Sequence, residues 1–149
     1  MIGLIQRVTE ARVEIASISG RQTVGEIGCG LLAFIGVTPS DTESNAARLA
    51  QRLINYRVFE DAAGRMNLSV RDISGGILLV PQFTLAADTR KGSRPGFSTA
   101  AAPGPARALY DKLVSAVKTL HPVVAEGCFG AEMHVSLVNH GPVTFWLDA

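Results

Sequence analysis

Two short segments combine polar side chains with proline, and they are the first candidates for a catalytic or binding role. Residues 81–85 read Pro-Gln-Phe-Thr-Leu, and residues 139–144 read Asn-His-Gly-Pro-Val-Thr. Their composition is typical of a strand end and a tight turn, and the simplest interpretation gives neither segment a chemical role. Thr84 carries a hydroxyl, but a hydroxyl needs an adjacent base to act as a nucleophile, and the neighbouring sequence offers none.

The familiar catalytic patterns are missing. The sequence has no Gly-x-Ser-x-Gly, no His-Glu-x-x-His, no P-loop and no Gly-x-Gly-x-x-Gly. Of the three histidines, we expect His121 at the surface or as a helix cap, His134 as a structural group on a strand, and His140 in a turn. Cys29 and Cys128 lack neighbouring ligands, so we expect both to be small packed side chains. The sequence therefore predicts neither a metal site nor a cofactor.

The most basic loop of the chain spans residues 88–97 and contains Arg90, Lys91 and Arg94. These side chains suit phosphate binding, and simple solvation is an equally good interpretation. The net charge is only +1, whereas proteins that grip a long duplex usually carry a clear basic excess. Near-neutrality fits a small-molecule substrate, or a nucleic acid that is held only at its tip.

Length and composition predict one domain over residues 1–149. Hydrophobic residues make up 47% of the chain and charged residues 18%, which is enough to fill one core. No apolar run approaches the ~20 residues of a membrane span, and residues 1–7 lack the order of a signal peptide. We therefore expect a cytosolic protein.

The order of predicted elements is strands, helix, strands, helix, strands, which indicates an α+β fold. The apolar runs at residues 30–37 and 77–80 predict buried strands, and Pro81 should end the second and leave backbone groups of residues 82–85 free. Ser40 and Glu43 fit a capping box before the first helix. The inward helix faces are predicted at helical spacing, at Ala46, Leu49, Ala50, Leu53, Ile54 and Val58, and then at Ala106, Leu109, Tyr110, Leu113, Val114 and Val117.

The C-terminal residues predict two more strands. Residues 133–137 alternate apolar and polar side chains, a turn follows at residues 139–142, and residues 143–147 are apolar at nearly every position. A terminal strand that is apolar on both faces needs cover, and a second subunit can supply it.

With these segments in view, the chain resembles the D-aminoacyl-tRNA deacylases, also called D-tyrosyl-tRNA deacylases. The family signature Asn-x-Gly-Pro-x-Thr is complete, as Asn139, Gly141, Pro142 and Thr144. A second signature is present as Gln82, Phe83 and Thr84, with Pro81 where the family usually has serine. Collinear similarity extends through residues 4–8, 24–28, 58–61, 66–68, 87–94 and 129–131, so it covers essentially the whole chain.

The resemblance implies a homodimer whose active site lies between subunits. Gly141 and Pro142, joined by a cis bond, would project into the partner's pocket and aim their carbonyl oxygens at the α-ammonium group of the substrate. Arg7 resembles the arginine that orients this pair, and Asn139 and Thr144, from the same signature, would belong with it to the substrate-binding set that selects chirality. An L side chain would strike the pair, whereas a D side chain or the hydrogen of glycine would point outward.

The resemblance also implies that D-aminoacyl-tRNA and glycine mischarged on tRNA are hydrolysed with help from the 2′-hydroxyl of the terminal ribose. The segment Gln82, Phe83 and Thr84 would be catalytic mainly through backbone N–H groups, with Thr84 as a positioning residue. Arg90, Lys91 and Arg94 would contact the 3′ acceptor end of the tRNA. No cofactor, metal, membrane or DNA partner is expected. The implied fold is a barrel-like core of antiparallel strands with two helices outside.

Two rival functions and one departure stay open on the sequence. The rivals are a non-catalytic RNA- or ligand-binding module with the same Gly-Pro pocket, and a small-molecule hydrolase or deaminase on a similar barrel. The departure is Pro81, because a related animal branch carries proline there and has relaxed chirality. Phe83 and the complete Asn139–Thr144 signature favour ordinary selectivity.

Overall fold

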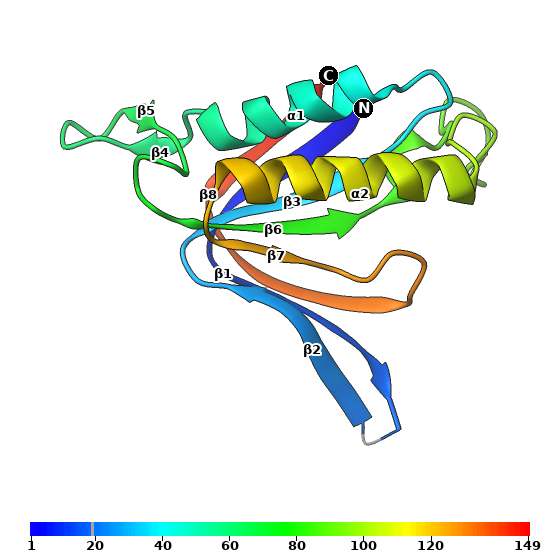
Figure 1. The fold of residues 1–149 in the computed structure, drawn as a ribbon, viewed down its shortest axis with the longest axis horizontal. Helices are drawn as coiled ribbons and strands as arrows, with labels where there is room; N and C mark the ends of the chain where they lie inside the picture. Colours follow the sequence, from blue (N-terminus) through cyan, green and yellow to red (C-terminus); the bar gives the residue numbers. More distant parts are fainter. Residues whose placement is uncertain (19) are drawn as a thin grey trace.

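A mixed six-stranded sheet forms the frame of the computed structural model, which describes residues 1–18 and 20–149 (Figure 1). Its central strand is β1 (Ile2–Ser17). One edge of β1 pairs antiparallel with β3 (Gly30–Gly36) and then with β2 (Gly20–Ile27), while the other edge pairs with β8 (Met133–Asp148). Strands β6 (Gly76–Pro81) and β7 (Val124–Glu126) extend the sheet beyond β3.

The predicted α+β class and barrel-like curl are confirmed, and the antiparallel prediction is right for every strand that pairs with β1. The pairs β3–β6 and β6–β7 are parallel. Parallel neighbours need a long crossover connection, and the two helices supply it. Helix α1 (Glu43–Asn55) lies between β3 and β6 in the chain, together with the small hairpin of β4 (Phe59–Glu60) and β5 (Met66–Leu68), and α2 (Pro103–Leu120) lies between β6 and β7.

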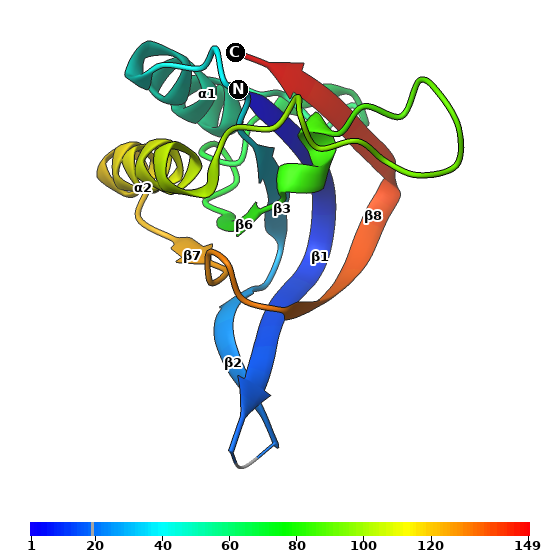
Figure 2. The ribbon, with the colours of Figure 1, turned by 90° about the vertical axis from the view of Figure 1, so that its right-hand side faces the viewer.

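Both helices cover the same face of the curled sheet (Figure 2). Their buried residues were all predicted from helical spacing, and they are Ala46, Leu49, Ala50, Leu53, Ile54, Ala106, Tyr110, Leu113, Val114 and Val117. Each fully buried leucine contributes roughly 1.5–3 kcal/mol to folding. A second, smaller core fills the inside of the curl, where Val8, Val13, Leu32 and Leu78 are almost fully buried. The two cores fix the strands on both faces.

Several local predictions were wrong. The capping box is formed by Thr42 and Asn45, because α1 begins at Glu43 and the Ser40 hydroxyl instead lies 3.2 Å from the Thr38 hydroxyl. His121 is the C-cap residue of α2, one of its two expected roles, but the surface alternative is wrong because its side chain is buried, with Nε2 2.6 Å from the Gly75 carbonyl oxygen. Cys29 and Cys128, expected to be packed, are both exposed.

Strand β6 ends at Pro81 as predicted, and a single 3₁₀ turn (Phe83–Ala86) follows it.

In the part of the chain that the structure describes, neither helix is long and apolar enough to span a membrane.

Candidate active site

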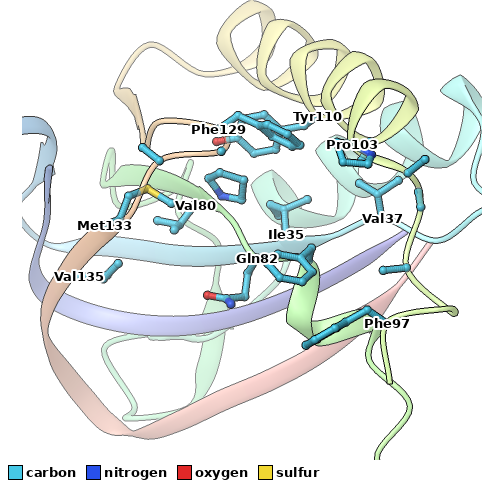
Figure 3. A pocket seen from close by; sticks show the side chains of 18 residues that line it. Ile35, Val37, Val80, Gln82, Phe97, Pro103, Tyr110, Phe129, Met133 and Val135 are labelled. Atoms are coloured by element: carbon cyan, nitrogen blue, oxygen red, sulfur yellow. The ribbon is translucent and has the colours of Figure 1, made fainter. Parts of the chain in front are cut away.

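An open cavity of about 640 Å³ lies where β3 and β6 end, beside the first turns of α2 (Figure 3). Its walls are mainly apolar and include Ile35, Val80, Phe97, Tyr110, Phe129 and Met133. Burial raises the pKa of Tyr110, whose O–H donates to the Leu79 carbonyl oxygen at 3.0 Å, so this phenol is a neutral part of the wall. The volume is in the range of roughly 300–1,000 Å³ that suits small-molecule and cofactor ligands.

The predicted catalytic segment lies at the mouth of this cavity. Gln82 and Phe83 line the cavity, and the Phe83 ring lies 5.1 Å from that of Phe97. The Gln82 amide N–H donates to the Ile35 carbonyl oxygen at 2.7 Å and so extends the β3–β6 ladder by one residue. Beyond it, the amide N–H groups of Phe83 and Thr84 have no backbone acceptor among the described residues. These two donors are therefore free to bind a ligand oxygen.

Thr84 does not lie in a nucleophile–base pair. Its hydroxyl is hydrogen-bonded to the Gln82 carboxamide, and no histidine or carboxylate bonds to it in the described part of the chain. A carboxamide cannot take up a proton at neutral pH, so the arrangement does not activate the hydroxyl. Its geometry fits a positioning residue.

The second predicted segment is not the turn between two strands that we expected. Residues 139–144 lie within the single long strand β8, which bends sharply between its orange and red parts in Figure 2. Gln6 pairs with Thr144 and Val8 with Asn139, so residues 140–143 stand opposite Arg7 alone. The surplus residues leave the ladder, and both Gly141 and Pro142 are exposed with a cis peptide bond between them. We call residues 140–143 the Gly-Pro loop.

Arg7 lies beneath the Gly-Pro loop and is almost completely buried. Its Nε donates to the His140 carbonyl oxygen at 2.6 Å and its Nη1 to the Val58 carbonyl oxygen at 2.8 Å. The guanidinium also lies 3.5 Å from the Glu60 carboxylate. The side chain thereby links one end of the loop to β4. At the other end, Gln6 Nε2 donates to the Thr144 hydroxyl at 3.1 Å.

Within one chain, the predicted site residues form two separate groups. Arg7, Asn139, Gly141, Pro142 and Thr144 gather at the Gly-Pro loop. Gln82 and Phe83 belong to the cavity, and none of its lining residues within the described chain comes from residues 139–144. The cavity and the Gly-Pro loop therefore do not meet in a single copy.

The basic loop is only partly available for phosphates. Arg90 forms a bidentate pair with the Asp88 carboxylate: Nε donates to Oδ1 at 2.9 Å and Nη2 to Oδ2 at 2.8 Å. Hydrogen bonds from the Arg90 side chain and amide hold the pKa of Asp88 well below its usual range. Lys91 and Arg94 are exposed and have no carboxylate partner among the described residues. Of the three predicted contacts, these two carry unneutralised charge.

The aromatic wall residues Phe97, Tyr110 and Phe129 were not predicted as site residues. Tyr110 was indistinguishable from the core stripe of its helix, and Phe97 and Phe129 each stand beside glycine in a loop, which is the one signal that could have marked them. Across residues 1–18 and 20–149, no three His, Cys, Asp or Glu side chains gather closely enough to hold a metal ion.

Comparison with known proteins decides the family. Residues 4–148 match the model of a family described as D-Tyr-tRNA(Tyr) deacylase. The chain belongs to this family. Membership makes it a deacylase, a hydrolase that acts on an ester bond, and confirms the resemblance inferred from the sequence.

Two curated relatives of this deacylase match it over almost its whole length. It is 62% identical over 148 residues to D-aminoacyl-tRNA deacylase of Thioalkalivibrio sulfidiphilus, covering 99% of this chain and 97% of that protein. It is 56% identical over 148 residues to D-aminoacyl-tRNA deacylase of Pseudomonas syringae pv. tomato, covering 99% of each.

Solved structures show the same fold. The c-Myc DNA unwinding element binding protein has a TM-score of 0.92 and 32% identity, covering 100% of this chain and 99% of its own. A probable eukaryotic D-amino acid tRNA deacylase has a TM-score of 0.86 over 99% of this chain and 98% of its own, and at 18% identity it supports the fold alone.

Gly141→Ala should inactivate the deacylase with little loss of global stability. A Cβ atom at position 141 would lie 2.0 Å from the Val143 nitrogen and 2.4 Å from Asn139 Oδ1, so the loop must shift. A displacement of about 1 Å in a positioning group can reduce the rate ~10²-fold. The matched control is Gly104→Ala, because no atom lies within 4 Å of a Cβ there. Steady-state kinetics and thermal melts of both variants provide the test, and wild-type kinetics for Gly141→Ala would contradict the prediction.

Proposed function

We propose that the chain is a cytosolic homodimeric enzyme that hydrolyses the ester between a D-amino acid and tRNA, and the ester of glycine mischarged on tRNA. Water attacks the ester carbonyl carbon, the bond to the ribose oxygen breaks, and free amino acid and tRNA are released. One observation carries the proposal: a chain of this family holds Gly141 and Pro142 outward, away from its own cavity. The pair therefore has no substrate to contact unless a second copy brings its cavity to it.

Selection of the D enantiomer follows from backbone contacts. No side chain among the described residues donates to the carbonyl oxygens of Gly141 or Pro142, so both can accept from the α-ammonium group of a substrate. Once the ammonium is fixed, only one substituent direction at Cα is open. An L side chain is rejected by collision with the loop, and no particular D side chain needs to be recognised.

The chemical step depends on positioning and on the substrate itself. The free amides of Phe83 and Thr84 can stabilise the oxyanion that develops on the ester carbonyl. The 2′-hydroxyl of the terminal ribose assists the attack. Because backbone amides and the substrate's own hydroxyl act in this step, the site needs no side-chain base beside Thr84.

Contact with the tRNA is assigned to the loop of residues 88–97, which borders the cavity through Phe97. Lys91 and Arg94 are its phosphate ligands, and Arg90 contributes less because Asp88 already neutralises it. A short basic loop beside the cavity suits a protein of net charge +1 that holds only the acceptor end.

A subunit-mixing experiment tests the shared site. Gly141→Ala damages the loop, and Ala131→Trp places an indole in the cavity that Ala131 lines. Each homodimer should be inactive on D-aminoacyl-tRNA, whereas a random mixture should regain about a quarter of the wild-type sites, because half of the dimers then hold one intact pair. The recovered activity should favour D over L substrate. Heterodimers without activity, or a monomeric wild-type mass, would exclude the shared site.

Removing charge from the basic loop should lower the salt dependence of tRNA binding. For Lys91→Ala and Arg94→Ala, the slope of log affinity against log salt should fall by about one unit each. Arg90→Ala should change the slope less, because its guanidinium is paired with Asp88. Titrations of uncharged tRNA at several salt concentrations provide the measurement. Unchanged slopes for both Lys91→Ala and Arg94→Ala would mean that the loop does not contact the tRNA.

Thr84→Ala should retain activity within about tenfold, whereas loss of a true nucleophile reduces rates by roughly 10⁴–10⁶-fold. A substrate that ends in 2′-deoxyadenosine should bind normally and turn over hardly at all. Thr119→Ala on the exposed face of α2 is the matched control. Single-turnover rates with both substrates separate the two mechanisms. An inactive Thr84→Ala enzyme, together with full wild-type activity on the deoxy substrate, would return the threonine to the role of nucleophile.

A further inference from the structure

In the Gly-Pro loop, the Asn139 side chain supplies hydrogen bonds that the strand ladder does not provide. In an antiparallel ladder, every second residue bonds to the opposite strand through both its N–H and its C=O. At Val143, which follows the surplus residues, both groups bond to the Asn139 carboxamide instead. The Val143 N–H donates to Asn139 Oδ1 at 3.2 Å, and Asn139 Nδ2 donates to the Val143 carbonyl oxygen at 3.0 Å. The carboxamide therefore takes the place of a peptide group of the opposite strand.

This pairing fixes the direction of the Pro142 carbonyl. The Val143 N–H and the Pro142 C=O belong to one peptide group, which is trans because the only cis bond in the described chain joins Gly141 to Pro142. In a trans peptide group, N–H and C=O point in opposite directions. Because the N–H is held toward Asn139, the Pro142 oxygen must point away from it.

Arg7 and Asn139 hold different ends of the loop. Arg7 binds the His140 carbonyl oxygen and so fixes the peptide group between His140 and Gly141. Asn139 fixes the peptide group after Pro142. Its Oδ1 also lies only 2.4 Å from the place of a Cβ on Gly141, so the carboxamide packs directly against the glycine.

We propose that Asn139 is a positioning residue that sets stereochemical selectivity by aiming the Pro142 carbonyl oxygen at the substrate ammonium group. This inference rests on the proposed function. Without the carboxamide, the Val143 N–H loses its acceptor and the peptide group after Pro142 can rotate. The ammonium then has no fixed site, and D and L substrates are no longer distinguished by the direction of their side chains.

Asn139→Asp provides a test that protonation can reverse. At neutral pH the carboxylate can still accept from the Val143 N–H, but it cannot donate to the Val143 carbonyl oxygen and repels it, so the two-bond pairing should break. A protonated carboxyl group offers one donor and one acceptor in the same shape, and its pKa in the absence of perturbation is about 3.9. The ratio of D to L kcat/KM should fall about tenfold or more at pH 7 and recover as the pH approaches 4. Asn139→Ala should lose the ratio at every pH.

Controls separate a positioning role from a structural one. The wild type and Asn55→Asp, an exposed change on α1, should keep their ratios over the same pH range. Hydrogen exchange at the Val143 amide should be slow in the wild type and at least about tenfold faster in Asn139→Ala, since this amide loses its acceptor. A ratio within twofold of wild type in both Asn139 variants at pH 7, or unchanged exchange at Val143, would overturn the inference.

The same data distinguish failure of the inference from failure of the proposed function. If the wild type does not hydrolyse D-aminoacyl-tRNA, the function is wrong, and hydrogen exchange at Val143 still tests the pairing. If the wild type is active and the Asn139→Asp ratio stays low at pH 4, recovery of the donor does not restore selectivity and the positioning role is wrong.

Discussion

The structure depends on an unequal number of residues in two strands that pair with each other, β1 and β8. Strand β1 is paired along both edges, its residues Ile5, Val8 and Val13 are buried in the two cores, and its Arg7 alone stands opposite residues 140–143 of β8. The surplus residues of β8 must therefore leave the sheet. Backbone groups that lose their ladder partners need others, because unpaired buried groups cost about 1–3 kcal/mol each. Arg7 and Asn139 supply those partners, and a loop that would otherwise be loose becomes a fixed projection.

A fixed projection of backbone suits chemistry that needs little from side chains. Carbonyl oxygens recognise an ammonium group whatever the amino acid is, and amide groups can stabilise an oxyanion without any titration. The free amides after Pro81 arise in the same way as the loop: a ladder stops and leaves polar groups without partners. Both halves of the proposed site are therefore places where the sheet ends or breaks, and they lie apart in one chain.

Sequence reasoning succeeded where a local pattern has one physical meaning. Helical spacing identified the buried faces of α1 and α2, and the missing N–H of Pro81 predicted the end of β6. Where partners are remote in sequence, it failed. The burial of His121 depends on Gly75, and residues 139–142 look like a turn until their pairing with β1 is known. The parallel β3–β6 pair likewise follows from a crossover that spacing alone does not reveal.

The proline at position 81 ends the backbone ladder on one side of β6 and leaves it intact on the other. Along β6, the Gln82 N–H points to β3, where it bonds to Ile35, while the Ile77 N–H points to the other side, where it bonds to Val123. Alternation along the strand puts the nitrogen of residue 81 on that second side, next to Gly127, whose N–H donates to the Leu79 carbonyl oxygen at 2.8 Å. Proline has no N–H to continue this ladder, so β6 ends there. Pro81 also forms part of the cavity wall, where it offers no hydroxyl. On the other side, the Gln82 N–H bonds to the Ile35 carbonyl oxygen, and this bond holds the start of the turn that carries the free amides of Phe83 and Thr84.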